Sequence, residues 1–496
     1  MSVLLVLAVI VFTSYILTLF RKPKNFPPGP QWIPWIGNTY KLRNEARKLG
    51  SQHKVFNKWS EDYNSKIIGF KLGKDNVVVV HGYDLVHKVH LDEVFEGRPD
   101  NFFLRLRTMG TRKGITCTDG PLWVEQRNFA VRHLRQAGYG KVQMDNHIRN
   151  ERNDLIEFIT NLNEAPTWPG SFLAPSIISV LWYLTASKKL ERTDKRLSRL
   201  LELLQQRSKA FDMCGGMLTQ MPWLRFIAPE KTGYNMICNL NKELHEFFMD
   251  HITEHNENFS NDKIERDVIY AYINEMKIRE GTVNNTFNDH QLTMTILDFF
   301  IAGSQTTSTT LDLSIMMLTL HPELQSELRD EIDKKVGEGI EPCYNNKNFF
   351  PKTEAFLMEV QRFFSIAPIT GPRRALWDTK LDGYDIPKDT TILIGLRSVL
   401  MDKKYWKDPE AFRYTRFLNE SKVVQHEYFM PFGQGKRRCL GDSLARSCLF
   451  TFFVGILQNF TIQIPENENP PSTDLLPGIT LSPKPYKVIF KERLLK

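Results

Sequence analysis

Residues 432–441 have the sequence Phe432-Gly433-Gln434-Gly435-Lys436-Arg437-Arg438-Cys439-Leu440-Gly441. One cysteine stands here among three glycines and three cationic side chains. Glycines let backbone N–H groups approach the sulfur closely, and such hydrogen bonds make a thiolate less basic. An apolar run follows and predicts a helix whose N-terminus lies beside the sulfur, where the helix dipole favours negative charge. The segment therefore predicts a shielded thiolate ligand.

This segment resembles the cytochrome P-450 family, because it fits the pattern F-x-x-G-x-R-x-C-x-G. The resemblance implies that Cys439 is the axial ligand of a haem b iron, since a thiolate donates electron density to iron and favours cleavage of the O–O bond. The alternative, a buried structural cysteine beside a basic turn, does not account for the complete pattern. Cys448 lies outside the pattern and is expected in the core.

The segment Glu359-Val360-Gln361-Arg362 places opposite charges three residues apart, so that they share a helix face and form an ion pair. Glu410 and Arg413 have the same spacing. The family has its E-x-x-R pair far upstream of the cysteine, which fits Glu359 and excludes Glu410. Without the cysteine segment, an ordinary surface pair would be the simplest interpretation.

By the same resemblance, Arg416 completes a structural network with Glu359 and Arg362, because a buried charge must be paired. The family usually has Pro and Glu before this arginine, whereas this chain has Tyr414 and Thr415. We expect this departure to change local hydrogen bonds and to leave the arginine in place.

Residues 302–307, Ala-Gly-Ser-Gln-Thr-Thr, resemble the family's oxygen-activation element within a helix. The Thr306 hydroxyl can bond a carbonyl one turn back and bend the helix, and the resemblance implies that it holds water for proton delivery. Gly303 is expected to open a groove beside the iron. Gln305 replaces the usual carboxylate, and an amide orients water but does not deliver a proton as an acid does. The alternative is a helix of small residues packed closely in a core.

Haem propionates are anions that need cationic or N–H partners. Trp123 and Arg127 resemble the family's W-x-x-x-R helix, which faces one propionate, and Arg437 joins them from the cysteine segment. Local similarity to the family adds Arg98 and Arg373 to the residues that are expected to bind the propionates. For these two arginines the alternative is a solvated position on the surface.

The N-terminus predicts a membrane anchor. Residues 3–20 carry no charge and would span about 27 Å as a helix, close to the thickness of a bilayer. Arg21, Lys22 and Lys24 follow, which by the positive-inside rule keeps the remainder cytoplasmic. A cleaved signal peptide fits less well, because no basic region precedes the run and no small-residue cleavage site closes it. We expect an anchor over residues 1–22, a Pro-rich hinge over 23–35 and one catalytic domain over 36–496.

Composition is that of a folded protein, with 42% hydrophobic and 25% charged residues. The net charge of +8 is spread along the chain. No block of Lys and Arg predicts nucleic-acid binding, so we expect no nucleic-acid partner. The six cysteines form no CxxC pair or regular ladder, which argues against a zinc site or a disulfide framework.

The residue pattern of the chain predicts a mainly α fold with a small β region. Residues 66–81 predict a short sheet and residues 120–335 are mostly helical. A long helix is expected over 289–320, ended by His321-Pro322. Strands and turns are expected over 372–396 and again over 461–490. The resemblance implies the cytochrome P-450 fold behind a single N-terminal transmembrane helix.

The resemblance further implies a haem-thiolate monooxygenase that inserts one atom of O2 into a lipophilic substrate. No Rossmann glycine fingerprint or flavin-binding segment is present, so electrons are expected from NADPH through NADPH–cytochrome P-450 reductase. The anchor implies the endoplasmic reticulum membrane, contact with membrane lipid, and a basic surface that meets the acidic reductase.

Residues 97–120, together with Ser304-Gln305, resemble insect enzymes that epoxidise methyl farnesoate to juvenile hormone, and their sister group. The pocket candidates, which are mostly apolar, are Phe103, Leu106 and Ile115, residues 211–217, then Asp298, Phe299 and Ala302, and residues 366–370. Oxidation of another terpenoid, steroid or xenobiotic is the alternative. Two alternatives of a different class are a haem-thiolate isomerase or dehydratase, which often lacks the Thr306-Thr307 pair, and a non-catalytic haem carrier.

Overall fold

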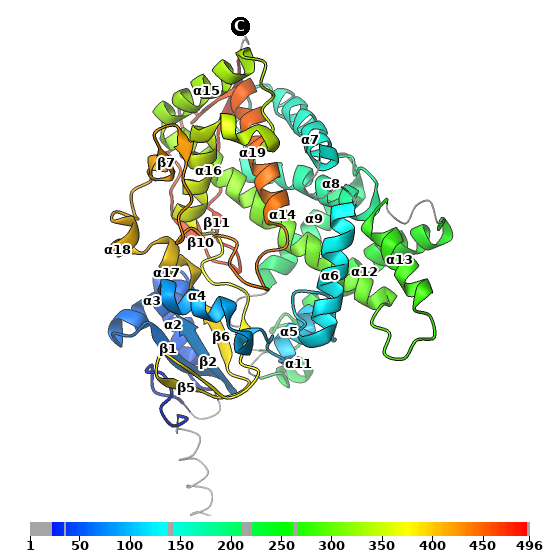
Figure 1. The fold of residues 1–496 in the computed structure, drawn as a ribbon, viewed down its shortest axis with the longest axis vertical. Coiled ribbons are helices and arrows are strands. Elements are labelled where there is room, and N and C mark those ends of the chain that lie inside the picture. The colour runs from blue at the N-terminus through cyan, green and yellow to red at the C-terminus, as the bar shows by residue number, and fades with distance from the viewer. Residues whose placement is uncertain are drawn as a thin grey trace, which may run out of the picture.

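A computed structural model describes residues 22–33, 36–136, 138, 142–210, 218, 221–260 and 266–493. The predicted membrane-spanning run over residues 3–20 lies outside the described residues. The described chain forms a helical body with a small sheet region at one end (Figure 1). This arrangement confirms the mainly α class with a small β part.

Helices form most of the body. The α-helices are α2 Thr39–Leu49, α3 Gln52–Asp62, α4 Tyr83–Leu91, α5 Phe102–Arg107, α6 Gly120–Gln136, α7 Val142–Thr160, α8 Leu173–Ala186, α9 Lys195–Ala210, α11 Leu224–Ile227, α12 Tyr234–Glu257, α13 Val268–Ile278, α14 Asp289–Leu320, α15 Pro322–Gly337, α16 Pro351–Phe364, α17 Leu396–Leu400, α18 Lys403–Trp406 and α19 Asp442–Asn459. Short 3-10 helices are η1 Glu93–Phe95, η2 Pro169–Ser171, η4 Tyr344–Phe349 and η5 Tyr414–Phe417.

The strands are short. They are β1 Ile67–Leu72, β2 Asp75–Val80, β3 Arg373–Arg374, β4 Thr379–Leu381, β5 Tyr384–Ile386, β6 Thr391–Ile394, β7 Leu418–Asn419, β8 Lys422–Val423, β9 Phe460–Gln463, β10 Leu475–Leu476, β11 Ser482–Pro483 and β12 Ile489–Glu492. Their positions confirm the strands predicted within 66–81, 372–396 and 461–490.

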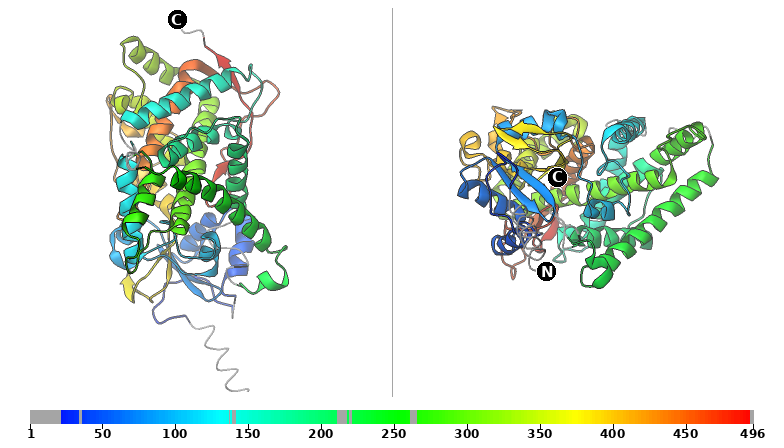
Figure 2. Two further views of the ribbon diagram at one scale, coloured as in Figure 1. Left: turned by 90° about the vertical axis from the view of Figure 1, so that its right-hand side faces the viewer. Right: turned by 90° about the horizontal axis from the view of Figure 1, so that it is seen from below.

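Helix α14 runs through the centre of the body (Figures 1 and 2). Its first turn is capped by the Asn288 side chain, which accepts a hydrogen bond from Gln291 N at 3.0 Å. The helix ends before Pro322, whose ring cannot continue it. It packs against α8, α12, α16 and α19, so it is buried on several sides. The predicted bounds are confirmed.

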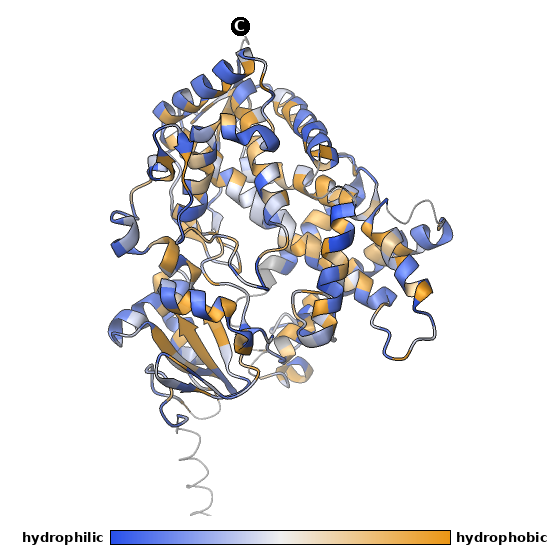
Figure 3. Cartoon of the chain, in the orientation of Figure 1, coloured by the Kyte–Doolittle hydropathy of each residue, from blue (hydrophilic) through white to orange (hydrophobic). Residues whose placement is uncertain are grey.

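The main sheet has the strand order β1-β2-β6-β3, in which β2 and β6 are parallel and the other pairs antiparallel. Val78 and Val80 pack in one apolar cluster, and Val77 and Val79 pack in another on the opposite face. Because both faces are covered, β2 is apolar without alternation. Figure 3 shows the resulting apolar strands.

The Pro-rich segment lies along β1. Gly69 N donates to Pro28 O at 2.8 Å, and a Cβ on Gly29 would lie 2.2 Å from Gly69 O. The described part of this segment is not helical, as proline predicts. The Pro-rich segment is therefore held in close contact with the sheet.

Among the described residues, one helical stretch is long and apolar enough to cross a membrane, at Pro169–Ala186. Of its residues, 72% are buried inside the body. It is therefore a core helix region of the folded chain.

Candidate active site

Cys439 lies in a turn that leads into α19, whose first residue is Asp442. Cys439 N donates to Phe432 O at 3.0 Å, which closes the turn. Gly433 and Gly435 have φ of +67° and +70°, a region that favours glycine. A Cβ on Gly435 would lie 2.2 Å from the backbone oxygen of His90 in α4. The cysteine segment therefore packs against α4 at a distance that only glycine allows.

The Cys439 side chain is accessible, although many protein atoms surround it. Burial raises the pKa of this thiol, and the backbone N–H of Gly441 opposes the shift. Asp442 raises the pKa further, while Arg127 and Arg438 lower it. A bound metal cation would supply the charge that favours the thiolate.

Arg98, Arg373 and Arg437 form an arginine cluster near this segment. Their guanidinium groups donate to backbone carbonyls, as Arg437 Nη1 does to Thr118 O at 2.8 Å. Burial first, and then mutual repulsion, lowers the pKa of Arg373 to about 9 and that of Arg437 to about 8. Within the described residues, the buried Nε atoms of Arg98 and Arg437 have no hydrogen-bond partner.

The carboxylates near the arginine cluster form ion pairs with other cations. Asp119 pairs with Arg374 at 2.8 Å and with Arg112 at 2.9 Å, and Glu96 pairs with Lys436 at 3.3 Å. The cluster thus favours additional anions, because buried cations require charged partners. One sulfur ligand beside several buried cations fits a haem, which carries an iron and two propionates.

Helix α6 brings Trp123 and Arg127 to the same place. The Arg437 guanidinium lies 3.7 Å from the centre of the Trp123 ring, within cation–π range, and that of Arg127 lies 5.7 Å from it. Arg127 Nη2 also donates to Arg438 O at 2.9 Å. The predicted W-x-x-x-R pair is therefore in contact with the cysteine segment.

On α14, Thr306 Oγ1 donates to Ala302 O at 2.8 Å, the bond expected for a mid-helix threonine. Ala302 is exposed although the rest of α14 is largely buried, so the helix face beside Thr306 is accessible. Gln305 is half-buried. We expected Gly303 to open a groove beside the iron, and that role stays a prediction. A Cβ there would lie 2.7 Å from Leu181, so this glycine allows close packing against α8.

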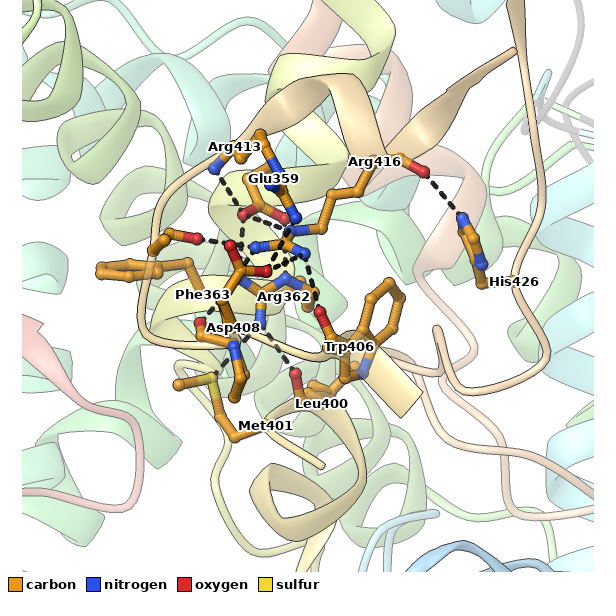
Figure 4. A network of polar contacts seen from close by, with 12 residues as sticks. Glu359, Arg362, Phe363, Leu400, Met401, Trp406, Asp408, Arg413, Arg416 and His426 are labelled. Atoms are coloured by element: carbon orange, nitrogen blue, oxygen red, sulfur yellow. Dashed lines mark hydrogen bonds and ion pairs between the residues drawn. The ribbon is translucent and has the colours of Figure 1, made fainter. Parts of the chain in front are cut away.

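Glu359 and Arg362 are both fully buried and form a two-point ion pair, with distances of 2.7 and 2.8 Å (Figure 4). Arg416 Nε contacts Glu359 Oε1 at 3.1 Å, and Arg413 N donates to the same oxygen at 2.8 Å. Arg362 also donates to Leu400 O at 3.0 Å. The network ties α16 to the chain that leads to the cysteine segment.

The departures near Arg416 have a local effect. Tyr414 is buried and shares a hydrogen bond with Glu327, and burial and this carboxylate raise its pKa. Glu410, which has the same E-x-x-R spacing as Glu359, instead pairs with Lys403 at 3.1 Å on the surface. Position relative to the cysteine therefore distinguishes the buried pair from the exposed one.

The family model for cytochrome P-450 matches residues 27–490 of the chain. The chain belongs to the cytochrome P-450 family. It is 54% identical to the probable cytochrome P-450 305a1 of Drosophila melanogaster, over 99% of this chain and 100% of the relative. It is 36% identical to the farnesoate epoxidase of Bombyx mori, over 99% of each, and 32% identical to cytochrome P-450 2J2 of Homo sapiens, over 94% and 91%. Membership implies a haem iron and a P-450 monooxygenase.

Some of the predicted pocket residues of this P-450 lie outside the part of the chain that the structure describes. Residues 211–217 and the side chain of Phe103 are not described. Among the described residues, no group of His, Cys, Asp and Glu could hold a metal ion, and the described cysteines are free. A P-450 iron requires one protein sulfur, so Cys439 suffices.

Sequence reasoning missed two arginines of this P-450. Arg107 ends α5, and Arg207 is buried on α9, with 3% of its surface exposed. Arg207 follows Leu200, Leu203 and Leu204 at helical spacing, so it falls on the apolar face of its helix. A cation on that face was the signal that could have identified it.

Proposed function

We propose that Cys439 is the axial ligand of haem b in this P-450 and that the surrounding cations hold the propionates. The residues assigned to the propionates are Arg98, Trp123, Arg127, Arg373 and Arg437. The observation that carries this proposal is the arginine cluster beside the Cys439 turn, because its buried cations lack sufficient carboxylates of their own.

When bound, the haem supplies the iron at which dioxygen is activated and one oxygen atom passes to the substrate. Thr306, held by its bond to Ala302 O, is proposed to keep a water on the accessible face of α14. Gln305 orients that water without donating a proton as an acid. The network of Glu359, Arg362 and Arg416 holds the chain that leads to the cysteine segment against α16.

We further propose that electrons come from NADPH through NADPH–cytochrome P-450 reductase. The proposed location is the endoplasmic reticulum membrane, with residues 1–22 as anchor, 23–35 as hinge and 36–496 as the catalytic domain in the cytoplasm. The uncharged run over residues 3–20 and the cations that follow it support this location.

For the substrate, we propose a lipophilic terpenoid, with epoxidation of methyl farnesoate to juvenile hormone as the first reaction to test. The 36% identity to a relative named farnesoate epoxidase, over nearly the whole chain, supports this choice. Other terpenoids, steroids and xenobiotics are the comparison substrates.

The ligand is tested by reducing the purified protein with dithionite, adding carbon monoxide and recording the difference spectrum. Wild type should show the strongly red-shifted Soret band of a thiolate-ligated haem. Cys439→Ser should lose this band or move it to the position of neutral-ligand haem proteins, whereas Cys238→Ser, at a half-buried cysteine on α12, should keep it. Bound haem without a thiolate band in wild type would contradict the proposal.

Turnover is tested with purified reductase, NADPH and methyl farnesoate. Substrate-dependent consumption of NADPH with an oxygenated product supports the monooxygenase. Rearrangement of a peroxide without NADPH would instead identify an isomerase, and haem binding without either reaction would identify a carrier.

A further inference from the structure

Four aromatic side chains from α4, α18 and the chain before the cysteine segment stack on one another. The centre of the Tyr428 ring lies 3.9 Å from that of Tyr405 and 4.3 Å from that of Tyr83. His87 follows Tyr83 by one helical turn of α4, and their ring centres are 5.3 Å apart. The planes of neighbouring rings differ by at most 15°, so each ring lies almost flat on the next. These four residues form the aromatic column.

One end of the aromatic column contacts the cysteine segment. His87 Nδ1 lies 2.7 Å from Oε1 of Gln434, at hydrogen-bond distance. The next residue, Gly435, packs against the backbone of His90 in the same helix. Helix α4 therefore holds this end of the column against the segment that carries Cys439.

The opposite end of the column is a phenol with a defined proton acceptor. His426 Nε2 lies 2.8 Å from the backbone oxygen of Arg416 (Figure 4). A carbonyl oxygen only accepts hydrogen bonds, so this ring nitrogen carries the proton, and in the neutral imidazole Nδ1 is left with the lone pair. Tyr405 Oη lies 3.0 Å from that nitrogen and therefore donates to it. The phenol proton of Tyr405 points at a base.

This arrangement has the parts that the oxidation of a phenol requires. A phenol that loses an electron becomes a strong acid, so a base that already holds its proton makes the oxidation easier. Rings that lie flat on one another in contact let an electron pass from face to face. Tyr405 and His426 supply the phenol and the base, and Tyr428 and Tyr83 supply the rings between this pair and the cysteine segment.

We infer that Tyr405 and His426 form a redox site, which returns electrons through the aromatic column to an oxidised haem when no substrate is bound. One electron leaves the Tyr405 ring and reduces the haem, while the phenol proton moves to His426 Nδ1. A neutral tyrosyl radical and an imidazolium remain. The site thereby removes an oxidising equivalent that would otherwise damage the haem. The inference rests on the proposed function, because it takes a haem on Cys439 as the electron acceptor.

A purely structural role is the competing explanation, since stacked rings also tie α4 to α18. The two roles differ in what they predict for the phenol hydroxyl of Tyr405. Stacking needs only the ring, so Tyr405→Phe keeps it. Oxidation with loss of a proton needs the hydroxyl as well, so the same substitution removes the redox site.

The test mixes the haem-loaded full chain with cumene hydroperoxide in the absence of substrate, freezes it rapidly and records the electron paramagnetic resonance spectrum. The peroxide oxidises the haem and is itself reduced to its alcohol, so no reductase is needed. Wild type should show a tyrosyl radical, whose signal narrows when the protein carries ring-deuterated tyrosine. Tyr405→Phe, His426→Phe and Tyr428→Leu, which remove the phenol, the base and a ring of the column, should each lower the signal by about tenfold or more.

Tyr384→Phe is the matched control, because Tyr384 is also a half-buried tyrosine but lies on β5, outside the column. It should keep the radical. The haem of Tyr405→Phe should also bleach faster in the peroxide than that of wild type or Tyr384→Phe. A wild type that has the thiolate-type carbon monoxide band but no tyrosyl radical, or equal radical and bleaching in wild type and Tyr405→Phe, would overturn the inference. A missing thiolate band in wild type would refute the proposed function itself.

Discussion

At the residue scale, the buried carboxylate of Glu359 holds several charges together. Both it and Arg362 are fully buried, and three groups share its carboxylate. Removing one partner of a buried pair typically costs about 3–5 kcal/mol, because the other charge stays buried without compensation.

We expect Glu359→Gln to lower the free energy of unfolding by about 3–5 kcal/mol, since Arg362 and Arg416 would keep their charges without the carboxylate. Urea unfolding followed by circular dichroism measures the change. Glu410→Gln is the control, because this carboxylate has the same local spacing but lies exposed beside Lys403. Equal effects of the two substitutions would show that the buried network is not important for stability.

Asp312 is a buried acid that the proposed chemistry does not use. It lies on α14, and its Oδ1 accepts a hydrogen bond from Tyr486 Oη at 2.8 Å. Burial raises the pKa of Asp312 to about 7, and the Tyr486 bond opposes the shift. In the unfolded chain an aspartate titrates near pH 4.

Between about pH 4 and pH 7 the folded state therefore binds more protons at Asp312 than the unfolded state does. Stability should fall as pH rises through this window, by up to about 1.4 kcal/mol per pH unit, and level off above it. Relative to Asp312→Asn, which has no such titration, wild type should lose stability from pH 5 to pH 7 in urea unfolding. The exposed Glu466→Gln should follow wild type, and parallel curves for wild type and Asp312→Asn would contradict the prediction.

At the element scale, the cysteine segment depends on how closely it approaches α4. Gly435 and Gly433 have similar positive φ, so any L-residue is strained at either position. They differ in their surroundings. A Cβ on Gly435 would meet the backbone oxygen of His90 at 2.2 Å, whereas one on Gly433 would have its nearest contact at 3.4 Å, with the His90 ring.

Gly435→Ala should therefore lower both the haem content and the thiolate-type carbon monoxide band much more than Gly433→Ala does. Both substitutions carry the φ strain, so the difference between them isolates the contact with α4. The ratio of the band to total protein measures it. Similar losses in the two variants would mean that backbone strain alone is responsible.

At the scale of the whole molecule, attachment to the membrane is the property to test. The Pro-rich segment is held against β1 through the Gly69–Pro28 bond, and a chain that starts at residue 23 keeps this contact. We expect a chain that starts at residue 23 to be extracted from microsomes by alkaline carbonate while keeping its carbon monoxide band. The full chain should stay in the pellet, and its extraction would contradict the proposed anchor.

The overall architecture could largely be predicted from local pattern. The bounds of α14 follow from the Asn288 cap and from Pro322, both of which act within a turn of the helix end. Trp123 and Arg127, which the resemblance places at a propionate together with Arg437, lie in contact with the cysteine segment. The close approach of Gly303 to Leu181 could not be predicted, because which neighbour a helix face meets depends on how α8 packs against it.

Residue type and spacing along the chain were enough to predict the cysteine segment and the helical class, whereas the buried Glu359–Arg362 pair could be chosen only by its resemblance to the family's E-x-x-R pair. Only the tertiary structure decided which charges share a site. The arginine cluster combines residues from three distant segments. Burial and mutual repulsion arise only when packing brings such residues together in a low-dielectric interior, and no local pattern encodes that proximity.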